Sequence, residues 1–178
     1  MEVRLMLWIH AHGSPVLDAL AWFSNQLGTT MFCVALVSAL GLWHLVRGER
    51  RLALCWVVVG LSVLVCQGGL KRLVARQRPE LWERSAARPV DFSFPSGHAV
   101  ASASFYPLVA FLLARHFPRR AWLCWSVAVA LAAFVGLGRL YLGVHWPSDV
   151  LAGWTLGATL AVVTMAGMDR TGELPARS

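Results

Sequence analysis

Residues 52–70 read LALCWVVVGLSVLVCQGGL, and this stretch decides the fold class of the chain. It carries no charged side chain, and its length is close to the roughly 20 residues that an α-helix needs to cross the hydrocarbon core of a bilayer. Four more apolar blocks of similar length occur along the chain, at residues 30–46, 99–114, 121–137 and 150–168. The sequence therefore predicts an all-α fold, a polytopic membrane helix bundle with five clear transmembrane helices.

The composition agrees with a membrane protein. Of the 178 residues, 57% are hydrophobic and only 14% are charged, whereas about a quarter of the residues in a soluble domain are charged. A soluble all-helical protein is the alternative, and the length of the apolar blocks disfavours it. The four cysteines lie inside apolar blocks without the spacing of a disulfide framework or a metal site, so we expect neither.

The segment before the first clear block is less regular. Residues 3–27 are apolar, but polar residues and Pro15 interrupt them between His10 and Asp18. The pattern fits a short interfacial helix followed by an amphipathic one, which we favour slightly, or a broken sixth transmembrane helix. Because no repeat or linker divides the chain, we predict a single membrane domain over residues 1–178. Its parts are an N-terminal segment (1–28), a helical core (30–168) and a cytoplasmic tail (169–178).

Arginine-rich loops indicate the orientation. The loops at 47–51 and 115–120 lie with the tail on one side of the predicted bundle, and the positive-inside rule makes this side cytoplasmic. The opposite side receives the loop 71–98 and the turn 139–148. The loop 71–98 also carries one lysine and five arginines, for which anion binding is a separate explanation. The net charge of +7 does not indicate nucleic-acid binding, because the arginines lie between apolar blocks.

The first polar cluster is KRLVARQRP at residues 71–79. Arg78 follows Lys71 by seven residues, about two helical turns, so both side chains are predicted to point from one helix end towards a common point. Pro79 is predicted to end that helix. A lysine supplies a compact charge and an arginine a planar fork suited to phosphate oxygens. The alternative is a cationic collar at the membrane edge.

The second cluster is FPSGH at residues 94–98, directly before an apolar block. Ser96 and Gly97 are predicted at a helix start, where backbone N–H groups can face an anion and Ser96 suits the N-cap. His98 has the pKa range for proton transfer near neutral pH. The alternative is a capping turn with an incidental histidine.

The third cluster is GRLYLGVHWPSD at residues 138–149. If Pro147 begins the last helix, the Asp149 carboxylate lies behind His145 and can accept from one ring nitrogen, which leaves the other nitrogen free to attack. Arg139 can bind the same anion. The alternative is an ordinary polar turn, with Asp149 favoured by the helix dipole.

By the span count, all three clusters emerge on one side of the membrane. Together they supply three cations, two histidines, a carboxylate and an amide-rich turn. Phosphoryl transfer without a metal needs this set: charge neutralisation, a nucleophile and an acid for the leaving group. We therefore expect neither a metal nor another cofactor.

The pattern K-x6-RP, PSGH and R-x5-H-x3-D resembles the type 2 phosphatidic acid phosphatase superfamily, and the likeness extends over residues 52–168. It implies an integral membrane phosphatase that hydrolyses a lipid phosphate or pyrophosphate through a phosphohistidine. The substrate-binding residues that it implies are Lys71, Arg78, Ser96, Gly97 and Arg139. The catalytic residues that it implies are His145 as nucleophile, His98 as general acid and Asp149 as the group that orients His145.

The chain departs from the resemblance at one position. The third block usually opens with serine, and here Gly138 stands there, so a hydroxyl next to Arg139 is missing. The soluble vanadium haloperoxidases share the pocket, but the apolar blocks disfavour that branch.

The small size and short loops are similar to bacterial members. We therefore expect a multi-pass protein of the inner (cytoplasmic) membrane with its site facing the periplasm or outside. That orientation favours undecaprenyl pyrophosphate as substrate, with phosphatidylglycerophosphate or phosphatidic acid as alternatives. A lipid phosphotransferase using the same histidine, or a non-catalytic lipid-phosphate binding or transport protein, are the competing functions. The expected partners are the lipid substrate and the bilayer, with no nucleic acid and no obligatory protein partner.

Overall fold

The computed structural model describes residues 1–82 and 90–174. Within them the secondary structure is entirely helical, which confirms the predicted all-α fold. The helices are α1 (Glu2–Ala11), α2 (Pro15–Leu27), α3 (Thr30–Val46), α4 (Arg50–Val74), α5 (Gly97–His116), the short 3₁₀ helix η1 (Pro118–Arg120), α6 (Ala121–Tyr141) and α7 (Pro147–Arg170).

Four of the described helices, α4 to α7, are each long and apolar enough to cross a membrane. The predicted span 30–46 corresponds to α3, which has 17 residues. It reaches spanning length only together with α2, and the two helices are bent by 43° relative to each other. The protein is thus a polytopic membrane helix bundle with four spans, or five if α2 and α3 form one bent span.

The N-terminal segment agrees with the favoured alternative in its helices, a short one followed by a second one. It forms two helices, and α2 begins where Ser14 accepts a hydrogen bond from the Leu17 N–H at 3.3 Å, with Pro15 in the first turn. Helix α3 follows α2 directly, with Gly28 and Thr29 between them. The Thr29 hydroxyl caps α3 by accepting from the Phe32 N–H at 3.2 Å.

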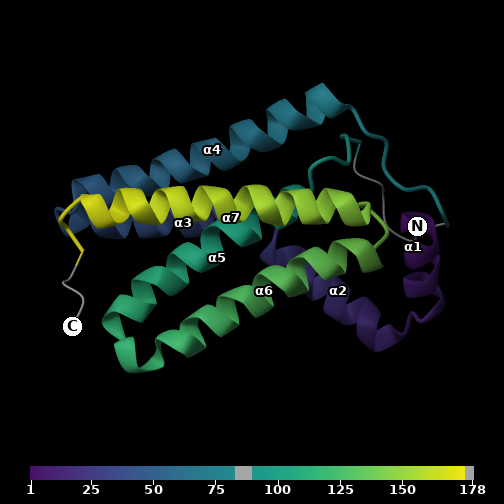
Figure 1. Ribbon diagram of the computed structural model, residues 1–178, viewed down its shortest axis with the longest axis horizontal. Coiled ribbons are helices and arrows are strands. Elements are labelled where there is room, and N and C mark those ends of the chain that lie inside the picture. Colours follow the sequence, from purple (N-terminus) through teal and green to yellow (C-terminus); the bar gives the residue numbers. More distant parts are fainter. Residues whose placement is uncertain (83–89, 175–178) are drawn as a thin grey trace.

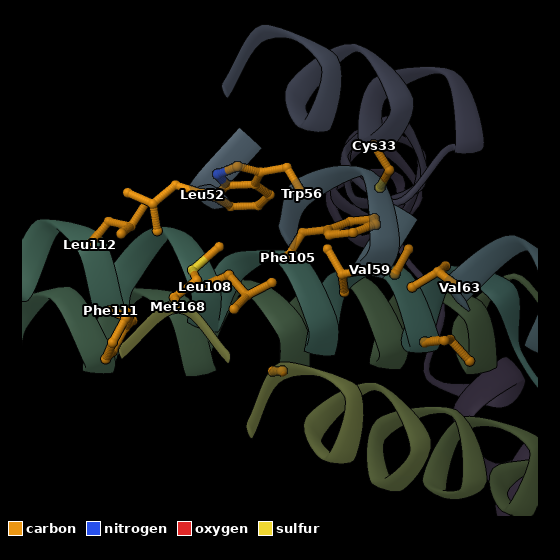
Figure 2. Packing of buried hydrophobic residues seen from close by; sticks show 13 residues of the cluster. Cys33, Leu52, Trp56, Val59, Val63, Phe105, Leu108, Phe111, Leu112 and Met168 are labelled. Carbon is orange, nitrogen blue, oxygen red and sulfur yellow. The ribbon is translucent and has the colours of Figure 1, made fainter. Parts of the chain in front are cut away.

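The main core lies between α3, α4, α5 and α7. Trp56 of α4 and Phe105 of α5 lie close together there, beside Leu108 and Met168 (Figure 2). Each of these four side chains is at most 3% exposed. Because lipid tails are as apolar as the core, close packing rather than the hydrophobic effect has to hold spanning helices together.

Two glycines let α7 approach α5 closely. A Cβ on Gly153 would lie 2.7 Å from the Ala99 Cβ, and a Cβ on Gly157 would lie 2.9 Å from the Ala103 Cβ. Glycines four residues apart are a common helix contact in membranes because they allow backbones to approach. This contact fixes the start of α7 against the start of α5. The outer faces of the spans remain apolar, as lipid contact requires, with Val162 for example 64% exposed.

The polar clusters meet at one end of the bundle. There α4 and α6 end, α5 and α7 begin, and α1 lies beside them at the end where the N-terminus is marked (Figure 1). The α3–α4 turn and η1 lie at the opposite end. The prediction that all three clusters emerge on one side is confirmed.

Candidate active site

Lys71 and Arg78 converge as predicted, and the Asp91 carboxylate is the point where they meet. Lys71 Nζ donates to Asp91 Oδ2, and Arg78 Nη2 donates to Asp91 Oδ1 at 2.6 Å. The predicted helical route between the two cations is wrong. Helix α4 already ends at Val74, and Ala75 adopts the left-handed conformation with φ 47° and ψ 36°. The chain therefore leaves the helix before Arg78, and Pro79 does not end it.

Asp91 pairs with both cations and offsets one of their two positive charges. Burial alone would raise the pKa of Asp91, but the hydrogen bonds from Lys71 and Arg78 outweigh burial and lower its pKa to about 2. The carboxylate is consequently ionised at neutral pH. It occupies the place between two cations where a phosphate group could bind. Arg84 and Arg88, which the sequence also offered as cations of this loop, lie outside the described residues.

His145 lies beside Arg78 and is 2% exposed. Arg78 Nη1 donates to the Val144 carbonyl at 2.7 Å and lies 3.1 Å from His145 Nε2. A guanidinium can only donate, so this contact requires the lone pair of the imidazole to be on Nε2. The tautomer that follows carries its proton on Nδ1, the nitrogen facing Asp149.

The Asp149 carboxylate lies behind His145, but the predicted hydrogen bond is not formed. His145 Nδ1 and Asp149 Oδ2 are 3.6 Å apart, which is ion-pair distance and too long for a hydrogen bond. Asp149 Oδ2 instead accepts from the Trp146 N–H at 2.8 Å, and Oδ1 accepts from Arg76 Nη1 at 2.6 Å. The predicted start of α7 at Pro147 is confirmed, and it gives Asp149 these partners in the first helical turn.

The environment of His145 keeps its ring neutral. Burial is the main cause that lowers the pKa of His145, to about 4. The Asp149 carboxylate opposes this change, while the charges of Arg78 and Arg139 add to it. A neutral imidazole with its lone pair on Nε2 is the form that can act as a nucleophile.

The FPSGH cluster supplies a hydroxyl and an imidazole. Ser96 is the N-cap of α5 as predicted, and its buried Oγ has no hydrogen-bond partner in the described part of the chain. The expectation for its backbone is wrong, because the Ser96 N–H donates to the Asp149 carbonyl at 3.1 Å and so is not turned to an anion. The Gly97 carbonyl accepts from Gln67 Nε2 at 3.1 Å.

The side chain of His98 lies against the end of α2. One ring nitrogen is hydrogen-bonded to the backbone carbonyl of Asn25. The other, Nε2, is buried and has no partner among residues 1–82 and 90–174. His98 lies within electrostatic reach of Arg139, His145 and Lys71, so the three clusters share one site.

Arg139 is in the last turn of α6 and is 5% exposed. The side-chain oxygen of Asn25 accepts a hydrogen bond from its Nη1. The preceding residue, Gly138, packs against Ser24, which is fully buried and donates to the Ala21 carbonyl. A Cβ on Gly138 would overlap the Ser24 hydroxyl. The glycine in place of the usual serine thus makes room for α2.

We expect Gly138→Ser to lower the melting temperature and kcat/KM, although it restores the residue usual at this position. Overpacking of this kind costs about 1–3 kcal/mol. Adding Ser24→Ala to the same chain removes the overlapping hydroxyl and should recover part of the loss. Melting temperature and kcat/KM of both single variants and the double variant check this. A Gly138→Ser protein as stable and active as wild type would contradict the packing argument.

Sequence reasoning missed three residues of this site. Arg76 bridges Asp149 to Glu2 of α1, with Nη2 donating to the Glu2 carboxylate at 2.8 Å. Asp91 pairs with two cations, and Asn25 contacts His98 and Arg139. Arg76 stood out only as one of several loop cations, and nothing in the spacing of Asp91 or Asn25 indicated their contacts.

Comparison with known proteins agrees with this geometry. Residues 50–173 match the family model of the PAP2 superfamily. The chain belongs to this superfamily. Helices α4 to α7 and the three clusters fall within the PAP2 region, whereas α1 to α3 precede it. Among the described residues, no group of three or more His, Cys, Asp or Glu side chains is placed to hold a metal ion.

Several PAP2 proteins are similar to this chain. Phosphatidylglycerophosphatase B of Bacillus subtilis (strain 168) is 30% identical over 104 residues, 58% of this chain and 50% of that protein. The chain therefore spans about half the length of this curated relative. The crystal structure of a transmembrane PAP2-type phosphatidylglycerolphosphate phosphatase from Bacillus subtilis superposes with a TM-score of 0.86 at 26% identity, covering 95% of this chain and 85% of that one. LpxE of Aquifex aeolicus shares the fold, with a TM-score of 0.64 at 22% identity over 93% and 94% of the two chains.

Proposed function

We propose that the protein is an integral membrane phosphatase that hydrolyses a lipid phosphate monoester through a phosphohistidine on His145. One observation carries the proposal. The buried His145 presents Nε2 to the cation Arg78 while its opposite nitrogen faces the Asp149 carboxylate. The ring is thereby neutral, oriented and next to a phosphate-binding charge, which are the requirements for nucleophilic attack on phosphorus.

The first half-reaction begins when a phosphate group replaces Asp91 between Lys71 and Arg78. Arg139 and the Ser96 hydroxyl supply further donors to its oxygens. Nε2 of His145 then forms a bond to phosphorus as the bond from phosphorus to the lipid oxygen breaks. His98 in its protonated form gives the Nε2 proton to the departing alkoxide and becomes neutral. Asp149 stabilises the positive charge that develops on the His145 ring.

The second half-reaction frees the enzyme. Neutral His98 takes a proton from a water molecule, whose oxygen attacks the phosphorus of the phosphohistidine. The bond between phosphorus and Nε2 breaks, inorganic phosphate leaves, and His98 is protonated for the next cycle. The Asn25 carbonyl suits this exchange because it holds one ring nitrogen as a donor in both forms, leaving Nε2 to release and accept the proton.

An apolar cavity supports a lipid as the substrate. It has a volume of about 580 Å³, lies between α3, α4 and α5, and is lined mainly by aliphatic side chains such as Val37 and Leu64. Gln67 also lines it and donates to the Gly97 carbonyl next to His98. The cavity is open along the exposed faces of α3 and α4 and reaches towards the candidate site at Gln67, so the tail of a lipid phosphate can lie in it.

Phosphatidylglycerophosphate is our first candidate substrate, because the 30% identical relative is a phosphatidylglycerophosphatase. Undecaprenyl pyrophosphate, the sequence-based preference, becomes the second candidate. Its support is the orientation in which the arginine-rich turns are cytoplasmic and the site faces the periplasm or outside of a bacterial cytoplasmic membrane. Phosphatidic acid is the third.

A labelled substrate panel tests the proposal. Purified protein in detergent with EDTA is given each of the three lipids labelled in the terminal phosphate. We expect labelled inorganic phosphate, released fastest from phosphatidylglycerophosphate. Label that moves to a second lipid would instead indicate a phosphotransferase, and binding without turnover would indicate a lipid-phosphate binding protein.

We expect Asp91→Asn to lower the KM for the lipid phosphate. The variant removes a charge that competes with the substrate for Lys71 and Arg78. A partly exposed ion pair is worth up to about 1 kcal/mol, which corresponds to about a two- to fivefold change. Because the pKa of Asp91 is lowered to about 2, acidifying wild type from pH 8 to pH 5 should not relieve this competition. Asp91→Glu keeps the charge and is the control, and a higher KM for Asp91→Asn would contradict the prediction.

A further inference from the structure

Asn25 of α2 contacts the site twice, although it lies outside the matched region 50–173. Its side-chain oxygen accepts a hydrogen bond from Arg139, and its backbone carbonyl is hydrogen-bonded to the ring of His98. These two residues come from different helices, α6 and α5. One residue of α2 therefore joins a candidate phosphate-binding cation to the candidate general acid.

The end of α2 is held firmly enough to position Arg139 and His98. A Cβ on Gly28 would lie 2.6 Å from both His98 Cδ2 and Val135 Cγ1, so the backbone of α2 has no room to move towards α5 or α6. Tyr106 of α5 donates its hydroxyl to the Leu27 carbonyl at 2.9 Å. Packing and a hydrogen bond thus hold the backbone directly after Asn25.

The partner that Asn25 provides for Arg139 differs in charge from the partners of the other cations in the site. Lys71 and Arg78 pair with the Asp91 carboxylate, and Arg76 pairs with Glu2 and Asp149. A carboxylate that binds a cation also cancels its charge. The amide oxygen of Asn25 is neutral, so this contact can orient the Arg139 guanidinium without offsetting its charge.

We propose that Asn25 is a positioning residue of the active site, which sets the spacing between the Arg139 guanidinium and the His98 imidazole. This inference rests on the proposed function, because its kinetic test measures the hydrolysis of a lipid phosphate. In the free protein Asn25 fixes the direction of Arg139 through its side chain and the ring of His98 through its backbone. Helix α2 thus belongs to the catalytic apparatus even though it precedes the region that defines the family.

The test compares substitutions of similar shape. Asn25→Leu keeps the volume and loses the acceptor, Asn25→Asp keeps an acceptor oxygen, and Gln26→Leu makes a matched change at the exposed neighbour. We expect Asn25→Leu to lower kcat/KM about 10- to 100-fold, as misplacement of a binding group does, and to raise the Ki of inorganic phosphate. Asn25→Asp should keep the contact to Arg139 but still bind inorganic phosphate more weakly than wild type, because its carboxylate cancels the charge of Arg139. Gln26→Leu should behave as wild type. If Asn25→Leu does not purify as a folded protein, Asn25→Ala replaces it under the same criteria.

A double variant separates positioning from general stability. If Asn25 acts through Arg139, Asn25→Leu should add little to the loss caused by Arg139→Ala, whereas independent effects multiply. The proposal is overturned if Asn25→Leu equals Gln26→Leu, if Asn25→Asp binds inorganic phosphate as tightly as wild type, or if the two losses multiply.

Inorganic phosphate keeps this test independent of turnover. If wild type hydrolyses none of the three lipids, the proposed function fails, and calorimetric binding of inorganic phosphate then decides the role of Asn25. Weaker binding to Asn25→Leu than to Gln26→Leu supports the positioning role. Equal binding to the two variants overturns it.

Discussion

His145→Ala is expected to abolish phosphate release, with a fall in kcat of about 10⁴-fold or more, because removal of a nucleophile leaves only binding and electrostatic assistance. The chain should still fold, since His145 lies in the turn between α6 and α7 and not in the core around Trp56. The measurement is release of inorganic phosphate from phosphatidylglycerophosphate by purified variants in one detergent. The melting temperature of each variant is taken in the same buffer.

His116→Ala is the matched control for this experiment. His116 is an exposed histidine at the far end of α5, where Nδ1 contacts the Leu112 carbonyl at 3.1 Å. Its replacement should leave kcat unchanged. Measurable turnover by a folded His145→Ala protein above the rate without enzyme would remove His145 as the nucleophile.

His98→Gln is expected to have the second largest effect. General acid catalysis contributes about 10²- to 10⁴-fold, and the loss should depend on the leaving group. A lipid alkoxide needs a proton as it departs, whereas 4-nitrophenolate is stable without one. We therefore expect a large fall in kcat for the lipid phosphate and a much smaller fall for 4-nitrophenyl phosphate. The glutamine side chain fills much of the space of the imidazole but cannot transfer a proton.

The comparison of the two substrates decides the role of His98. Equal losses on the lipid phosphate and on 4-nitrophenyl phosphate would mean that His98 positions other groups and gives no proton to the leaving group. Ser96→Ala is a useful reference here, because removal of a hydroxyl donor to phosphate should affect both substrates alike.

Much of the fold was predictable because it depends on local sequence. Apolar blocks such as 52–70 had to become spanning helices, and Pro147 could be placed at a helix start because its fixed φ suits the first turn. Alternating spans then brought the clusters to one end. The convergence of Lys71 with Arg78 followed from this, even though the expected helical connection was wrong.

The features that the sequence did not predict depend on contacts that no local sequence pattern encodes. Helix α4 ends at an alanine in the left-handed conformation, a position where glycine is the usual signal. Asn25 and Asp91 each contact two residues that are distant in the sequence or follow no fixed spacing. In the sequence, Gly138 indicated only that a hydroxyl is missing, because the packing of Ser24 against it can only be seen in three dimensions.

The most direct test of the central claim is to look for the covalent intermediate. Protein treated with EDTA is mixed with lipid phosphate labelled in the terminal phosphate and quenched in alkali within a single turnover. We predict a labelled wild-type chain whose label resists alkali, is lost in acid and maps to His145, and no label on the His145→Ala chain. Full phosphate release by wild type without a labelled chain, or equal labelling of the variant, would contradict a phosphohistidine at this site.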